Sequence, residues 1–502
     1  MRYRDLRFRP RPALQTPPDR VGVAPHVERA IADAAMMEEI GHAAPLALRD
    51  QIIFLLTAAT EVEHSLLVQY LYAAYSLETD PARFVGPDLT QAVRLTGKAA
   101  GWQEKIAKTA QEEMGHLMTL QNVLRLLGGP LNFEREVFPF RSQFYPFHFI
   151  LEPLTKTSLA KYIAAEMPEH PDPQVMSEYQ RRTILQRAEL GTNGLPINRV
   201  GALYQTLIEL VRMLPEEDFV LDDANHDESR LKLSYEADAD SWGASGDLNP
   251  FNGVKLILAT KSSVVDALTV IARQGEGTMA TAAQPESHFE RFLSIYLDSD
   301  FPDERDEPVS WFAARPVPTN PNTSEASDPD PQQERILVPG RITNSTTLLW
   351  AQLFNVRYRM LLADLVHYLR LSSLDCVDAR SKLNEYAFVE MLIGIKPLAL
   401  RLTTLRQHAD DSRGDFAVAG APFELPYTLA MPLSEADRWR LHRDLLVASD
   451  HLIDAIRNTP SGSDPDDPVL KPIEDFDDGR RSFIAEQITQ AVPTLVAIAG
   501  GS

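Results

Sequence analysis

The sequence predicts an all-α protein, with a four-helix bundle that carries insertions and is followed by a second helical region. Apolar residues recur every three or four positions through most of the chain, which is the period of an amphipathic helix. Two such stretches, residues 44–77 and 91–127, are each roughly 30 residues or longer, and long neighbouring helices are typical of bundles. Strand patterns, in which apolar and polar residues alternate, are weak throughout.

The first long stretch carries an acidic residue on its apolar face. The apolar stripe consists of Ile52, Leu56, Ala59, Leu66 and Tyr70. Glu63 falls on the stripe, four residues after Ala59 and three before Leu66. A carboxylate that faces a core must be paired or bound to a metal, because burying an unpaired charge costs several kcal/mol.

The second long stretch carries a Glu-x-x-His motif on its apolar face. Its stripe runs through Ile106, Ala110, Leu117, Leu120, Leu124 and Leu127, and the helix is expected to end at Gly128-Gly129-Pro130. Glu113 lies on the stripe and His116 lies beside it. Residues at i and i+3 share one helix face, so Glu113 and His116 can bind one metal ion together.

The remaining elements are shorter. An aromatic crossover over 131–156 leads to a short helix that Pro168 ends, and its residues 138–150 are a candidate wall of a substrate pocket. Further helices are expected over 198–214, 262–275 and 286–297, with an acidic excursion over 215–250 between the first two. In the C-terminal part, helices are expected near 345–371, 381–408, 434–457 and 480–498.

These elements divide the chain into four parts. They are an N-terminal arm over 1–45, a metal-binding bundle over 46–300, a linker over 301–340 and a C-terminal helical region over 341–502. Pro and acidic residues cluster in 298–339 and again in 459–478. Both clusters are interpreted as solvated loops.

Composition excludes several functions. The 502 residues include 71 Asp and Glu against 49 Lys and Arg, and a net charge of −22 argues against a nucleic-acid binder. The single cysteine excludes a disulfide framework or a Cys-rich metal site, which leaves oxygen and imidazole as metal ligands. No apolar run is expected to span a membrane, and the N-terminus lacks a secretory signal. We therefore expect a cytoplasmic protein, with a homo-oligomer left open.

The second half of a two-metal site is expected later in the chain. In carboxylate-bridged dimetal bundles, each half supplies one Glu and one Glu-x-x-His pair. Glu166 lies on the apolar face of its short helix, and Glu276 continues an apolar stripe that ends in Gly275. His288 precedes Phe292 and Ile295 at helical spacing. Together with Glu63, Glu113 and His116, these residues make a set of four Glu and two His, which is the ligand set of a two-iron carboxylate site. The later half of this set contains no Glu-x-x-His pair.

Other residues compete for these roles. Glu61 and His64 form a second Glu-x-x-His, but they point away from Glu63 around the helix, so His64 is expected beyond the ligands or on the surface. Glu209 is the rival acid of the third helix, and Glu112 is expected on a solvated face. Four C-terminal histidines, with no shared spacing, are not expected to bind metal: His367, His408, His442 and His451.

Several motifs together resemble the ferritin-like domain of the iminophenyl-pyruvate dimer synthase type. The motifs are EVEHSLLVQYLYAAYSL (61–77), QEEMGHLMTLQNVLRLLGGP (111–130), YIAAEMPE (162–169), VGALYQTL (200–207), RQGEG (273–277) and SHFERF (287–292), with AGAPFELP (419–426) beyond them. The resemblance implies a ferritin-like four-helix core and a non-haem iron site. Its matching ligand positions are Glu63, Glu113, His116, Glu166, Glu276 and His288. Synthases of this type couple two indole imino acids oxidatively.

These observations predict a di-iron enzyme, with manganese as the alternative metal. It would use dioxygen to oxidise a small organic substrate, possibly derived from an amino acid, in natural product biosynthesis. Tyr70 and Tyr204 lie on the apolar stripes and are candidates to orient ligands or relay electrons, and core packing explains them about as well. The alternative is a non-catalytic ferritin-like protein that binds or stores iron.

Overall fold

The computed structural model is helical wherever it can be described. The described residues are 47–84, 88–136, 138, 144–192, 194, 197–219, 258, 260–276, 286–306, 311–324, 340–371, 376–409, 417–425 and 428–491. Within these ranges, extended backbone pairs only at isolated bridges such as that between Leu77 and Ala314. The all-α prediction is confirmed. The expected arm over 1–45 and most of the acidic excursion lie outside the described residues.

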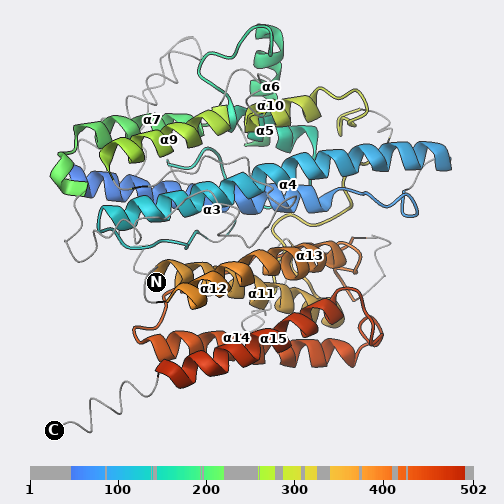
Figure 1. The fold of residues 1–502 in the computed structure, drawn as a ribbon. Coiled ribbons are helices and arrows are strands. Elements are labelled where there is room, and N and C mark those ends of the chain that lie inside the picture. Colours follow the sequence, from blue (N-terminus) through green and yellow to red (C-terminus); the bar gives the residue numbers. More distant parts are fainter. Residues whose placement is uncertain are drawn as a thin grey trace, which may run out of the picture. The chain divides into compact units, whose positions relative to one another are not determined.

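Four helices form the core of the N-terminal half (Figure 1). They are α3 (Leu48–Ser76), α4 (Leu89–Leu126), α7 (Val200–Met213) and α9 (Lys261–Glu276). Helix α3 packs on α4 and α7, and α9 packs on the same two helices. The contacts therefore close a ring of four helices, as the pair of long amphipathic segments predicted.

Helix α3 is buried on almost every side. It contacts α4 and α7 of the bundle and also α13 of the C-terminal region. One 18-residue window of α3 has a mean hydropathy of 1.3, so by length and composition alone the helix could cross a membrane. No segment of this kind was expected from the sequence. However, 67% of that window is buried within the protein. An all-round apolar surface is what a helix needs when it packs on several sides.

Three shorter helices insert beside this core: α5 (Lys156–Glu166), α6 (Glu178–Gly191) and α10 (His288–Tyr296). Helix α10 contacts α4, α5 and α9, so it closes one side of the bundle. Helix α6 was not predicted, because it buries only three residues and shows no clear stripe. The sequence feature that marks the start of this helix is a capping box, in which Ser177 and Gln180 bond each other's backbone N–H.

The acidic connection after α10 is packed onto the helices, which differs from the solvated loop expected over 298–339. The Glu304 carboxylate accepts hydrogen bonds from the first backbone N–H groups of α5, at Lys156 and Thr157. Asp303 pairs with Arg187 of α6. Carboxylates at a helix start satisfy amides that lack partners within the helix, so these acids anchor the insertion.

The C-terminal region contains α11 (Ser345–Arg370), α12 (Val377–Val389), α13 (Lys396–Leu402), α14 (Glu435–Arg457) and α15 (Leu470–Ala491). A π-helical segment, Glu390–Ile395, joins α12 to α13, where one uninterrupted helix over 381–408 was predicted. A side chain at Gly394 would overlap the Glu390 carboxylate, so this glycine makes room for a buried acid.

A network of buried charges holds these helices together. Arg357 of α11 bonds Glu390 at 2.7 Å and Asp477 of α15 at 2.6 Å, and all three side chains are fully buried. Arg480 of α15 bonds Asp364 of α11 at 2.9 Å. The expectation of a solvated loop over 459–478 is therefore wrong in part, because α15 begins at Leu470 and turns Asp477 inward. A proline at 472 does not prevent this, since the first helical turn tolerates proline.

Two C-terminal histidines also meet, although their sequence spacing did not connect them. The Nδ1 atom of His367 lies 3.0 Å from Nε2 of His442. Their outer nitrogens face Glu435 at 2.9 Å and Asp364 at 3.2 Å. The described residues hold two sets of converging metal donors, and neither contains these histidines.

Replacing Arg357 with Met should destabilise the protein strongly, because Glu390 and Asp477 would lose their shared buried cation. The expected loss is about 3–5 kcal/mol of unfolding free energy. The matched control is Arg481→Met, whose partner is Asp450 and whose side chain is 39% exposed. There we expect at most about 1 kcal/mol. Chemical denaturation followed by circular dichroism measures both, and equal effects would contradict the assigned role of the network.

Candidate metal centre

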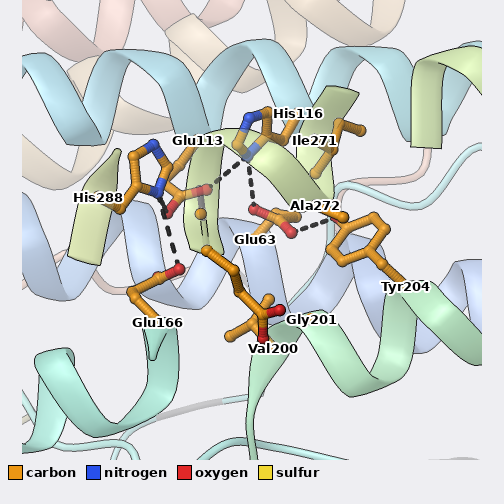
Figure 2. A pocket seen from close by; sticks show the side chains of 12 residues that line it. Glu63, Glu113, His116, Glu166, Val200, Gly201, Tyr204, Ile271, Ala272 and His288 are labelled. Atoms are coloured by element: carbon orange, nitrogen blue, oxygen red, sulfur yellow. Dashed lines mark hydrogen bonds and ion pairs between the residues drawn. The ribbon is translucent and has the colours of Figure 1, made fainter. Parts of the chain in front are cut away.

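The six residues expected as metal ligands line one pocket within the four-helix core (Figure 2). They are Glu63, Glu113, His116, Glu166, Glu276 and His288. The remaining wall consists of α7 and α9 residues, namely Val200, Gly201, Tyr204, Ile271, Ala272 and Gly275. The space between the atoms is about 230 Å³. None of the described residues of the crossover lines this pocket, and residues 139–143 of the expected wall lie outside the described ranges.

Two kinds of helix position supply the ligands. Glu63 of α3 and the Glu113–His116 pair of α4 lie well inside long helices, where neighbouring turns hold them rigidly. The other three lie at helix ends. Glu166 is the last residue of α5, Glu276 is the last of α9 and His288 is the first of α10. The second half of the site is therefore built where three helix termini meet, which explains why it lacks a helical spacing motif.

The first set of converging donors comes from α3 and α4. The Nδ1 atom of His116 lies 2.8 Å from Oε2 of Glu113 and 3.4 Å from Oε2 of Glu63. All three side chains are at most 2% exposed. Their donor atoms lie within 4.8 Å of one another, close enough to share one ion.

The second set shares Glu113 with the first. The Nδ1 atom of His288 lies 3.1 Å from Oε1 of Glu113 and 3.8 Å from Oε2 of Glu166. These donors also lie within 4.8 Å of one another. The two oxygens of Glu113 therefore face different imidazoles, with one oxygen in each set. This is the placement that a carboxylate needs to bridge two ions.

Both imidazoles turn their other nitrogen to a hydrogen-bond acceptor outside the pocket. Nε2 of His116 lies 2.8 Å from Oε1 of Gln274, and Nε2 of His288 lies 3.0 Å from Oε2 of Glu112. An N–H at each Nε2 leaves the Nδ1 lone pair directed at the pocket, as a metal ligand requires. The expectation of a solvated Glu112 is therefore wrong. Its carboxylate bonds His288 and Arg291, and it is 13% exposed.

Two tyrosines hold carboxylates of the site. The hydroxyl of Tyr204 donates to Oε1 of Glu63, and that of Tyr70 donates to Oε1 of Glu166 at 2.6 Å. Both tyrosines are buried. In both Glu63 and Glu166 the tyrosine bonds Oε1, and Oε2 is the oxygen that faces a histidine of the pocket. The tyrosine thus helps to hold each carboxylate in this orientation.

Glu276 lines the pocket but belongs to neither donor set. Its Oε1 atom accepts a hydrogen bond from Nη1 of Arg199 at 3.1 Å. The backbone N–H of Gly201 also bonds this carboxylate. Burial raises the pKa of Glu276 to about 7, against the opposing charge of Arg199. The structure thus places five of the six expected donors together and holds the sixth aside.

Burial and neighbouring charges shift the pKa values of the site. Burial and the charge of Glu113 raise the pKa of Glu63 to about 8. Burial opposes the charged form of Glu113, but His288 and His116 outweigh it and hold its pKa well below the usual value. Burial also opposes charge on the two histidines, yet the adjacent carboxylates raise both imidazole pKa values well above the usual value. The metal-free site therefore binds protons near neutral pH.

The competing residues lie elsewhere. His64 is fully buried and bonds the hydroxyl of Tyr358 from α11, so it is not a surface residue, and its partner lies outside the pocket. Glu61 bonds Asn132 at 3.2 Å and Tyr145 at 3.3 Å. Glu209 is exposed, as expected. None of the three lines the pocket.

The donor chemistry fits a pair of divalent ions. Among the described residues, Glu63 Oε2, Glu113 Oε1 and His288 Nδ1 are buried atoms of the pocket that make no hydrogen bond of regular geometry, although each lies close to a charged neighbour. Buried polar atoms normally have partners, so these atoms indicate a bound group. Carboxylate oxygens with imidazole nitrogens suit iron and manganese. Four carboxylates also carry the charge that two divalent cations would neutralise.

Comparison with known proteins agrees with the helical core. The family model described as Ferritin-like matches residues 56–297. The chain is 25% identical to the dichlorochromopyrrolate synthase of Lentzea aerocolonigenes in an alignment 409 residues long. The alignment covers 76% of this chain and 36% of the synthase. The match therefore spans about a third of that relative's length. No solved structure shows a significant match.

Replacing Glu112 with Ala should weaken metal binding by about 10–100-fold, the usual effect of removing the partner of a metal-binding histidine. His288 would lose the acceptor that fixes its tautomer and ring orientation. The matched control is Glu104→Ala, an exposed acid on the same helix. Calorimetric titration with Mn²⁺ measures both variants. If Glu104→Ala weakens binding equally, the effect reflects surface charge and the role of Glu112 is wrong.

Proposed function

We propose that the ferritin-like domain of residues 56–297 makes this protein a di-iron oxidoreductase. It would use dioxygen to oxidise a small organic substrate, derived from an amino acid, in specialised metabolism. The observation that carries the proposal is Glu113, whose two oxygens each face a different His-containing donor set. The similarity to a synthase of dichlorochromopyrrolate supports a biosynthetic role.

Each donor set would hold one iron ion. Glu63 and His116 would bind the first ion, Glu166 and His288 the second, and Glu113 both. A pair of iron ions supplies the electron transfer to dioxygen that these side chains cannot perform themselves. The protein's own part is to fix the ligands before the ions bind, through Tyr204 and Tyr70 on the carboxylates and through Gln274 and Glu112 on the imidazoles.

The surroundings keep bulk water out. The ligands in the two donor sets are at most 2% exposed, and aliphatic residues of α7 and α9 cover the pocket. The centre of a water molecule can reach only about 10 Å³ of the pocket, which is about the room for a single water molecule. The pocket as it stands therefore suits ions, and an organic substrate would have to bind beside it. We propose that the organic substrate approaches from the α7–α9 wall, because the candidate ligands of α3, α4, α5 and α10 occupy the other sides of the pocket.

Anaerobic titration with Fe²⁺ tests the proposal directly. We expect close to two ions per chain, and oxidation of both ions when oxygen is admitted, followed by optical absorption. A protein that binds no iron would contradict the proposal, and many ions per chain would favour the storage alternative. Glu113→Ala should reduce the stoichiometry below two, since both sets share this residue. His116→Ala should remove one ion, and Glu104→Ala should leave two.

Metal binding should release protons. The pKa of Glu63 is raised to about 8, and those of His116 and His288 are raised as well, so the metal-free site holds protons at pH 7. Metals bind the deprotonated forms, so affinity for Mn²⁺ should rise with pH between about 6 and 8. Calorimetry in buffers with different ionisation enthalpies counts the protons released. Binding without proton release at pH 7 would contradict this expectation.

A further inference from the structure

Glu276 has a binding place of its own, separate from the donor sets. Its carboxylate lies at the N-terminus of α7, where it bonds the side chain of Arg199 and the backbone N–H of Gly201. Arg199 is the N-cap residue of α7 and makes no side-chain capping bond, so the carboxylate from α9 satisfies this helix end instead. The N-terminal end of a helix dipole also favours a negative charge.

The fit at this place is close. A Cβ atom at position 201 would overlap the Glu276 carboxylate, so only glycine allows the two helices to approach in this way. Arg199 is 5% exposed, and its second partner is Glu169, at 3.6 Å and 59% exposed. Glu276 is therefore the less exposed of the two counterions of Arg199. The same carboxylate borders the pocket that holds both donor sets.

We propose that Arg199 is a positioning residue that competes with the metal centre for the Glu276 carboxylate. While Arg199 and Gly201 hold the carboxylate, the centre has five protein ligands, with three carboxylates. When the carboxylate leaves Arg199 and turns into the pocket, it becomes the sixth ligand. Arg199 thus sets how readily a coordination position is open to other molecules. This inference rests on the proposed metal-binding function.

Co²⁺ is a suitable probe, because its visible absorption depends on the number and arrangement of its ligands. The first variant is Arg199→Met, which removes the competing cation and keeps an apolar stem. We expect the affinity for Co²⁺ to rise by about tenfold or more, the usual scale for groups that contact a ligand. The spectrum should change toward a higher coordination number. Arg199→Lys should restore much of the wild-type behaviour.

The control for simple loss of charge is Arg273→Met, on the exposed side of α9 and three residues before Glu276. It should leave the Co²⁺ spectrum unchanged. In the double variant Arg199→Met with Glu276→Gln, the gain in affinity should disappear, because the carboxylate that produces it is gone. Gly201→Ala provides an independent route, since the added methyl group displaces the carboxylate while Arg199 stays. It too should change the Co²⁺ spectrum.

The outcomes separate the two claims. If the wild-type protein binds no Co²⁺, the proposed metal function fails and this inference fails with it. If the wild-type protein binds two ions but Arg199→Met behaves like Arg273→Met, only the inference is wrong. A gain in affinity that persists in the double variant would also overturn it. Thermal unfolding followed by circular dichroism shows which variants are folded. If Arg199→Met does not fold, the Co²⁺ spectrum of Gly201→Ala tests the inference instead.

Discussion

The central constraint on this molecule is that a carboxylate buried among helices needs a positive partner. Glu113 shows it most directly, because each of its oxygens lies about 3 Å from the Nδ1 of a different imidazole. The alternative, an unpaired buried charge, costs several kcal/mol. The packing of α5 and α10 beside the four-helix core meets this requirement. These two helices bring Glu166 and His288 to the Glu113 carboxylate of α4.

The C-terminal region meets the same constraint in another way. There, Arg357 and Arg480 supply fixed guanidinium charges to Glu390, Asp477 and Asp364. An acid paired with arginine has no need of an ion, and these acids belong to neither set of metal donors. In the pocket, by contrast, no described arginine contacts the donors of the two sets, and the partners of Arg199 are Glu276 and Glu169, which belong to neither set. The distribution of arginine therefore separates structural acids from candidate ligands.

The hydrogen bonds around the ligands connect the centre to residues of every neighbouring helix. Gln274 of α9 bonds His116, and Glu112 of α4 bonds His288. Tyr204 of α7 donates a hydrogen bond to Glu63, and Tyr70 of α3 donates one to Glu166. The protein itself thus holds the candidate ligands in place, as the partners around a metal site usually do.

The sequence by itself determined the helical class, most helix positions and the faces on which Glu63, Glu113 and His116 lie. These properties follow from the 3.6-residue period, which acts over a few turns and is visible in a single chain. Apolar-face positions also indicated Glu166, Glu276 and His288 as candidate ligands, and the resemblance of separate motifs implied the same three residues. Only the tertiary structure decided which acids have partners. Glu112 bonds His288, 176 residues away, and Asp477 bonds Arg357, 120 residues away. Period and composition place a side chain on a face, but pairing depends on which helices pack together.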